Sequence, residues 1–201
     1  MTAVARIETE RLLLREPLPG DAEIWGDYIT DPDFRRYVPV RISDETPSER
    51  AERSLRNLRD RWDSAPLVAL GWVICRRSDG QLIGTGGVEV GEIPGDGELD
   101  YRYGKPFWGQ GYGREAAHAM SRFTIEHLPI ERLTAYIVPG NEGSIRIAEG
   151  LGLIYQGDVD YMQFFPDPSQ IILANPMTRM YAARLADVRL RDVGYRVLTP
   201  A

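Results

Sequence analysis

Three glycines at alternate positions, Gly109, Gly111 and Gly113, lie between a β-type segment and a segment of helical periodicity. Glycine tolerates positive φ and has no side chain, so such a turn lets the backbone approach a ligand closely. The amides of the helical turn that follows have no partner within the helix, and they point outward with the positive end of the helix dipole. This arrangement predicts a phosphate-binding turn where a strand leads into a helix.

Two common phosphate-binding patterns do not fit this turn. A dinucleotide fingerprint reads G-x-G-x-x-G and has an acidic residue at the end of the next strand, whereas this turn reads G-x-G-x-G and the next strand ends at Val138 and Pro139. A P-loop needs Gly-Lys-Ser/Thr, whereas position 114 is Arg and is followed by Glu115. The turn by itself leaves open another phosphate ligand or a purely structural role.

The remaining periodicities predict an α+β fold rather than a regular alternation of strands and helices. Thr46 and Glu49 have the spacing of a capping box with Pro47 at the first helical position, and Asp79-Gly80 is typical of a tight hairpin. Strands are expected at 12–15, 68–76, 82–90, 98–103 and 133–138 and within 155–165 and 177–185, with helices at 21–29, 46–62 and 143–151 and from the glycine turn to about 127. The stretch 32–44 is expected to be irregular, and the tail beyond 185 is uncertain.

The bulk composition favours a single domain over 1–201, with its core at about 7–185. The net charge of −6 argues against nucleic-acid binding. The sequence contains no apolar run of about 18 residues, which argues against membrane insertion. The N-terminal segment lacks the features of a secretory signal, which favours a cytoplasmic location. With Cys75 alone and only His118 and His127 as imidazoles, we expect no metal site.

Several segments together resemble the GCN5-related N-acetyltransferase (GNAT) family. They are the strand at 98–103, the turn at 109–116 (GQGYGREA), the segment at 141–146 (NEGSIR) and Gly152-Leu153. The opening segment at 8–15 (ETERLLLR) is similar to the ribosomal-protein N-acetyltransferases of RimJ/RimL type, and the likeness extends from about Ile7 to at least Gly157. The turn departs from the family pattern at Trp108, where the family usually has Gln or Arg.

The resemblance implies a mixed, mostly antiparallel sheet flanked by helices, with a splayed strand pair that holds acetyl-CoA. It implies transfer of an acetyl group to an amine, on either a small molecule or a protein N-terminus, and it leaves the oligomeric state open, a dimer included. The residues that it assigns to the coenzyme are Gln110, Gly111, Tyr112, Gly113, Arg114, Asn141 and Ser144.

Attack of an amine on a thioester needs a base, a donor to the developing oxyanion and an acid for the thiolate. Glu98 is the preferred base because it matches an acidic position that is frequent in the resembled branch, and Asp100 and Glu89 are alternatives. Glu98 and Asp100 share one face of their strand, close to the expected position of the thioester. A solvated carboxylate without a catalytic role is an equally good interpretation of Glu98. The backbone N–H of Tyr103 is the expected oxyanion donor.

The residue expected to protonate the thiolate departs from the family pattern, because the family's usual Tyr, four residues after Ser144, is replaced by Ala148. Ser144 is therefore the leading donor, with Tyr155 and Tyr161 in reserve, although Asn141 and Ser144 also fit a simple helix start. Because this Tyr is missing, a non-catalytic coenzyme A-binding or regulatory module is an alternative function. The sequence also leaves open transfer of an acyl group longer than acetyl.

Acceptor recognition is expected from residues 32–62 and from the C-terminal strands. Tyr37, Trp72 and Tyr101 are candidates for the wall of an apolar slot, with ordinary core packing as the alternative. The many Arg residues of the helix at 46–62 are interpreted as a solvated face without a function.

Overall fold

The structure is a computed structural model that describes residues 5–63, 68–91, 93–173 and 175–198. The helices are α1 (Asp21–Thr30), α2 (Pro32–Arg35), α3 (Pro47–Asp60), α4 (Tyr112–His127) and α5 (Glu142–Gly150). The strands are β1 (Arg6–Glu8), β2 (Leu12–Arg15), β3 (Val40–Arg41), β4 (Ala69–Arg76), β5 (Leu82–Val90), β6 (Asp96–Tyr103), β7 (Arg132–Ile137), β8 (Ile154–Asp160), β9 (Ile171–Ile172), β10 (Met177–Arg184) and β11 (Arg196–Leu198). These elements confirm the predicted α+β class.

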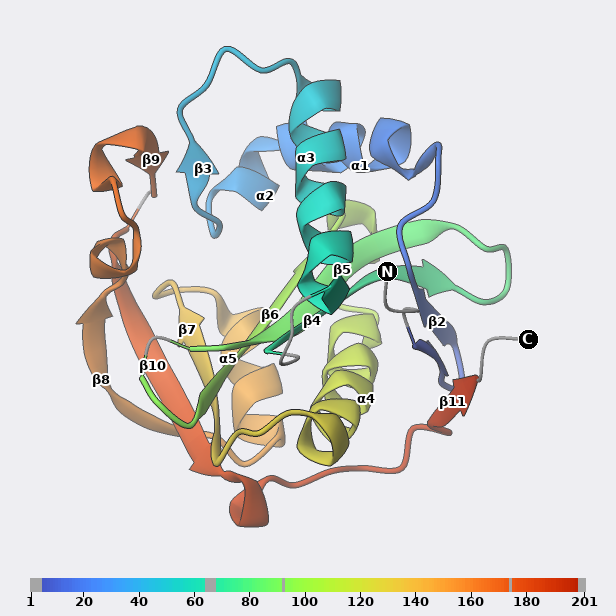
Figure 1. Ribbon diagram of the computed structural model, residues 1–201, viewed down its shortest axis with the longest axis vertical. Coiled ribbons are helices and arrows are strands. Elements are labelled where there is room, and N and C mark those ends of the chain that lie inside the picture. The colour runs from blue at the N-terminus through green and yellow to red at the C-terminus, as the bar shows by residue number, and fades with distance from the viewer. Residues whose placement is uncertain (1–4, 64–67, 92, 174, 199–201) are drawn as a thin grey trace.

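The main sheet has the strand order β11-β1-β2-β4-β5-β6-β7-β10-β8 within the described residues, and only β6 and β7 pair in parallel. Helices α1–α3 lie on one face of the sheet, and α4 and α5 lie on the other (Figure 1). Glycines in β5 let both layers come close. A Cβ at Gly86 would lie 3.0 Å from the Met120 side chain of α4, and one at Gly87 would lie 2.5 Å from the Arg61 side chain beyond α3.

Trp72 lies in the core and does not wall a slot. Its side chain is fully buried, and its ring meets Trp62 at 5.3 Å and Phe123 at 5.6 Å edge to face. The indole N–H donates to the carbonyl of Ala5 at 2.8 Å, which satisfies its one polar group. The interpretation of Trp72 as part of an acceptor slot is therefore wrong, and ordinary core packing explains this residue.

Helix α3 begins as predicted, because Thr46 and Glu49 form both bonds of a capping box. The expected irregular stretch at 32–44 is more ordered than the sequence indicated. Asp31 caps the short helix α2 by accepting from the amide of Asp33 at 2.8 Å. Further on, β3 pairs with β9 in a separate two-stranded sheet. A strand of two residues with so distant a partner has no local periodicity to reveal it.

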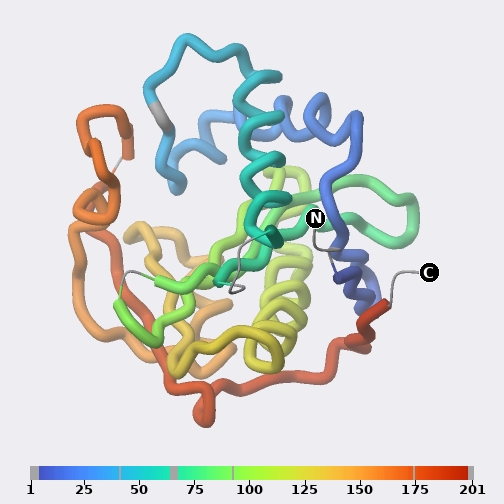
Figure 2. The backbone as a smooth tube through the Cα atoms, viewed as in Figure 1, coloured from blue at the N-terminus to red at the C-terminus, as the bar shows by residue number. Residues whose placement is uncertain are grey.

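The C-terminal segment belongs to the sheet rather than trailing from it. In Figure 2 it runs from β10 past α4 to the opposite sheet edge, where β11 pairs with β1. On the way, the amide of Arg189 donates to Leu151 O at 2.8 Å, and the amide of Glu10 donates to Val193 O at 2.8 Å. The structural core thus extends beyond the predicted limit of about 185.

Candidate active site

Strands β6 and β7 separate part of the way along their length. They pair only from Asp96 to Glu98 on β6 and from Arg132 to Thr134 on β7, and beyond these residues no strand of the described part of the chain pairs with β6 on that side. Two backbone hydrogen bonds at the ends of the β5–β6 pairing, Gly91 N–H to Asp96 O and Gly104 N–H to Ile83 O, show which residue pairs are hydrogen-bonded. Hydrogen-bonded and non-hydrogen-bonded residue pairs alternate along antiparallel strands. Tyr101 and Tyr103 belong to non-hydrogen-bonded pairs, so their amides point away from β5 into the gap.

The glycine turn at the end of this gap has the backbone that the sequence predicts. Gly109 and Gly111 have φ values of 74° and 82°, and Gly111 is the N-cap of α4. A Cβ at Gly113 would lie 3.0 Å from the Ile147 side chain and 3.3 Å from the Tyr103 ring, so glycine lets α4 approach both α5 and β6. Unpaired amides of the first turn of α4 therefore face the gap.

Most residues assigned to the coenzyme line one cavity of about 800 Å³ between β6, β7, α5 and the glycine turn: Gln110, Gly111, Gly113, Arg114, Asn141 and Ser144. Tyr112 does not line it. Its side chain is buried at 9% exposure, under the guanidinium of Arg11 at 4.7 Å, so only its backbone remains available to a ligand. Trp108, which departs from the family pattern, is half-exposed and donates from its indole N–H to Tyr103 O at 2.7 Å.

A buried carboxylate at the start of α4 ties the turn to the opening segment of the chain. Glu115 accepts from the Thr9 hydroxyl at 2.6 Å, from the Arg11 amide at 2.8 Å and from Arg11 Nε at 2.6 Å. The same Arg11 side chain donates to Gln110 O at 3.0 Å. The opening segment therefore holds the glycine turn in place, a role that its own sequence pattern did not reveal.

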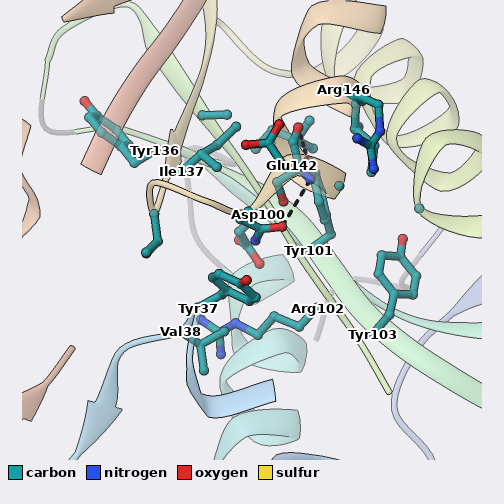
Figure 3. Close-up of a pocket in the computed structure, with 18 of the residues that line it drawn as sticks. Tyr37, Val38, Asp100, Tyr101, Arg102, Tyr103, Tyr136, Ile137, Glu142 and Arg146 are labelled. Atoms are coloured by element: carbon teal, nitrogen blue, oxygen red, sulfur yellow. Dashed lines mark hydrogen bonds between the residues drawn. The ribbon is translucent and has the colours of Figure 1, made fainter. Parts of the chain in front are cut away.

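The wall that α5 contributes begins at a capped helix. Asn141 accepts from the Ser144 amide at 3.3 Å, so it acts as the N-cap, as the helix-start interpretation expected. Tyr101 donates from its hydroxyl to Ser144 O at 3.4 Å, and burial raises the pKa of this phenol to about 12. Figure 3 shows Glu142 and Arg146 on this side of the cavity, with Tyr37, Val38 and Arg102 on the other. Tyr37 and Tyr101 thus line the cavity that Trp72 does not reach.

The three candidate bases lie together on the sheet face that carries α3. Glu98 and Asp100 are two residues apart on β6, and Glu89 is the cross-strand partner of Glu98. Arg61 binds two of them, donating to Asp100 at 2.8 Å and to Glu89 at 3.2 Å. The interpretation of every Arg on this helix as merely solvated is therefore wrong at Arg61. Glu98 instead accepts from the Tyr161 hydroxyl at 2.6 Å.

The electrostatic surroundings of Glu98 suit a base. Burial raises the pKa of Glu98 to about 7, although the Tyr161 hydrogen bond opposes this, and the charges of Asp100 and Glu89 add to it. A base whose pKa lies near the working pH is present in its ionised form and still binds a proton well. Burial, reinforced by the negative charge of Glu98, also raises the pKa of Tyr161, which keeps the phenol protonated as a donor.

Of the two reserve donors, only Tyr161 is part of the site. Tyr155 is half-exposed on β8, at the sheet edge, where its hydroxyl donates to Asp158 Oδ1 at 2.8 Å. Tyr161 follows β8 directly and lines the main cavity. Its partner Glu98 is 63 residues away in the chain, so no local sequence pattern links the two.

We expect Tyr161→Phe to raise the pKa that governs the acidic limb of the activity profile. The hydroxyl stabilises the ionised form of Glu98, so its removal favours protonation, and the limb near pH 7 moves to higher pH. The measurement is kcat/KM across pH for the variant and the parent. Tyr155→Phe, which removes a hydroxyl outside the cavity, is the matched control and should leave the pKa of the acidic limb unchanged. An unchanged limb in Tyr161→Phe would contradict the coupling.

Among the residues that the structure describes, no group of three or more His, Cys, Asp or Glu side chains is arranged to hold a metal ion. None of the helices in the same part of the chain combines the length and apolarity needed to cross a membrane.

Comparison with known proteins gives a consistent result. Residues 11–154 match the family model described as an acetyltransferase (GNAT) domain. A protein named "Uncharacterized N-acetyltransferase p20" from Bacillus licheniformis is 27% identical over 150 residues, which covers 74% of this chain and 82% of that protein.

Solved structures with the same fold include a ribosomal-protein-S5-alanine acetyltransferase from Vibrio fischeri, with a TM-score of 0.68 at 19% identity, covering 92% of this chain and 98% of that one. Another is Mycobacterium smegmatis RimJ in complex with CoA-disulfide, with a TM-score of 0.66 at 17% identity, covering 90% of this chain and 85% of that one.

Proposed function

This chain belongs to the GNAT acetyltransferase family, and on that premise we propose that it transfers an acetyl group from acetyl-CoA directly to a primary amine. The observation that carries the proposal is the gap between β6 and β7, which joins the glycine turn to Glu98 within one cavity. A turn suited to the phosphates of the coenzyme and a base of matched pKa therefore lie in the same cavity. The acceptor, whether a small amine or a protein N-terminus, and the cytoplasmic location remain predictions of the sequence.

Coenzyme binding follows from the chain's own donors. The turn at Gln110 to Arg114 offers backbone amides at the start of α4 and a guanidinium, which suits a pyrophosphate. The amides of Tyr101 and Tyr103, turned into the gap, suit the amide-bearing arm of the coenzyme and its carbonyl. When bound, acetyl-CoA supplies the activated acyl group.

The chemical roles divide among few residues. Glu98, directly or through a water, takes the proton of the attacking amine, and Tyr161 orients its carboxylate. The Tyr103 amide donates to the carbonyl oxygen as negative charge develops there. Ser144 donates a proton toward the departing thiolate, because the position that normally carries a phenol is the buried Ala148. Asp100 and Glu89 form ion pairs with Arg61, whereas Glu98 is bonded to the neutral hydroxyl of Tyr161.

Calorimetric titration of acetyl-CoA tests the first half of this proposal. Binding in the micromolar range is expected, since KM values of enzymes commonly lie between about 1 µM and 1 mM. Desulfo-coenzyme A is a suitable comparison ligand because it keeps the pyrophosphate. Failure of both ligands to bind at millimolar concentration would remove the basis of the proposal.

Ser144→Ala tests the assignment of the acid. The substitution is expected to lower kcat by about 10²-fold, the lower end of the usual general-acid effect, while acetyl-CoA still binds. The loss should shrink when the donor is a thioester whose thiol has a low pKa, because such a thiolate leaves without protonation. A kcat unchanged by the substitution would exclude Ser144 and direct attention to the neighbouring phenol of Tyr101.

The second candidate function is a coenzyme A-binding or regulatory module without turnover, which the Ala148 position favours. A thiol-release assay over a panel of primary amines separates the two. Release that depends on the amine and on Glu98 supports the enzyme. Tight binding of acetyl-CoA with no release for any amine supports the module.

A further inference from the structure

A second, smaller cavity of about 270 Å³ lies beside Glu98 on the sheet face that carries α3. Asp96 and Glu98 of β6 and Thr134 and Tyr136 of β7 share this face, because alternate residues of a strand point the same way. Glu98, Tyr136 and Tyr161 line both this cavity and the main one, so the two spaces adjoin at the proposed base. Drug-sized ligands need roughly 300–1,000 Å³, so this space fits a shorter chain.

The charged side chains among the described residues that line the small cavity are all carboxylates: Glu89, Asp96 and Glu98. Arg132 binds both oxygens of the buried Asp96 at 2.7 Å, so this carboxylate is neutralised. Arg61 binds Glu89 through Oε2 at 3.2 Å, and Glu98 accepts from the neutral hydroxyl of Tyr161. Glu89 and Glu98 are therefore the acidic groups that an entering cation would meet.

Aromatic rings also line the small cavity. Tyr136, Tyr161 and Phe164 are mutually in contact, with ring centroids 5.2 to 5.5 Å apart, and Phe165 lies 5.7 Å from Tyr161. Aromatic faces attract organic cations within about 6 Å of the ring centroid, more strongly where water is excluded. A lining that combines aromatic rings and carboxylates suits an alkylammonium group, whose chain is apolar and whose end is charged.

We infer that the small cavity binds a second ammonium group of the acceptor, so that the acceptor is an aliphatic diamine or a longer polyamine. One amine reaches Glu98 and the thioester, while the alkyl chain passes Tyr161 and the other ammonium lies against the aromatic rings and Glu89. This inference rests on the proposed acetyl transfer and names its substrate class. A folded protein's N-terminus lacks such a second cation on a short flexible chain.

Thiol release from acetyl-CoA is measured with diaminopropane, diaminobutane and diaminopentane, and with butylamine and aminobutanol as matched acceptors that lack the second cation. We expect kcat/KM for the best diamine to exceed that for butylamine by at least about tenfold, the effect of one desolvated cation–aromatic contact. Equal values for diaminobutane, butylamine and aminobutanol would overturn the inference while leaving acetyl transfer intact.

Two variants locate the effect. Phe164→Leu removes one aromatic face and Glu89→Gln one negative charge, and each should lower the ratio of diamine to monoamine kcat/KM by about fivefold or more. Glu149→Gln, which removes an exposed carboxylate of α5 outside both cavities, keeps the parent ratio. A ratio unchanged in both cavity variants would show that the selectivity arises elsewhere and would overturn the assignment.

Binding separates failure of this inference from failure of the proposed function. If no amine releases thiol, acetyl transfer to these amines is refuted, and the cavity is then tested by titrating diaminobutane and butylamine into the protein with coenzyme A. Preferential binding of diaminobutane, weakened in Phe164→Leu, supports the cavity's assignment. Equal binding of the two amines, or none, rejects it.

Discussion

Glu98→Gln is expected to lower kcat/KM by about 10²- to 10⁴-fold, the usual contribution of a general base. The amide has nearly the shape of the carboxylate but cannot take the proton of the amine. Acetyl-CoA binding should be unchanged, because the glycine turn lies at the far end of the gap. Steady-state kinetics and calorimetry on the same preparation measure the two quantities.

The pH dependence of activity tests the same assignment of Glu98 as the base. The pKa of Glu98 is about 7, so the carboxylate is protonated and inactive below that pH, and the activity of the parent protein rises through it. In Glu98→Gln the residual activity should lose this limb. If the activity of Glu98→Gln still rises with pH near 7, a group other than Glu98 governs the acidic limb.

Asp100→Asn and Glu89→Gln serve as comparisons, because their carboxylates belong to the same cluster but are paired with Arg61. Both carboxylates raise the pKa of Glu98, so each substitution should shift the acidic limb to lower pH. A loss in Asp100→Asn as large as that in Glu98→Gln would transfer the role of base to Asp100.

Patterns that repeat within a few residues were enough to predict most of the framework. The capping box at Thr46 and the glycine turn at 109–113 form as expected, because each depends on backbone geometry that neighbouring residues dictate. The strand pair that splays was likewise anticipated, through the family resemblance. The capping box and the positive φ values of the glycine turn thus follow from residues close in the chain.

Contacts between distant segments could not be predicted in this way. Arg61 belongs to the same Arg-rich stretch as Arg56 and Arg59, and only the folded sheet brings Asp100, 39 residues away, within 2.8 Å. The Tyr161 hydroxyl likewise meets Glu98 across 63 residues. A residue's periodicity indicates which face it occupies, whereas its partner depends on how the elements pack.

Glu115→Ala is expected to lower the free energy of unfolding by about 2–3 kcal/mol, because it leaves two backbone or hydroxyl donors and a guanidinium without their acceptor. The loss is smaller than for a fully buried ion pair, since the Arg11 side chain is 43% exposed and water can reach it. For a chain of this size the midpoint of thermal unfolding should fall by roughly 5–10 °C. Thermal and urea unfolding measure the effect.

The same substitution should weaken acetyl-CoA binding, although Glu115 does not line the cavity. Arg11 connects Glu115 to Gln110 O, and once this anchor is lost the glycine turn is held less firmly for the pyrophosphate. The KM for acetyl-CoA should therefore rise several-fold with a smaller change in kcat.

Glu126→Ala, on the same helix with one exposed hydrogen bond to Tyr195, is the matched control and should change neither quantity. Normal coenzyme affinity in a clearly destabilised Glu115→Ala protein would show that the anchor stabilises the fold without positioning the turn. Because Arg11 needs Glu115 in order to hold Gln110, stability and coenzyme affinity should instead fall together.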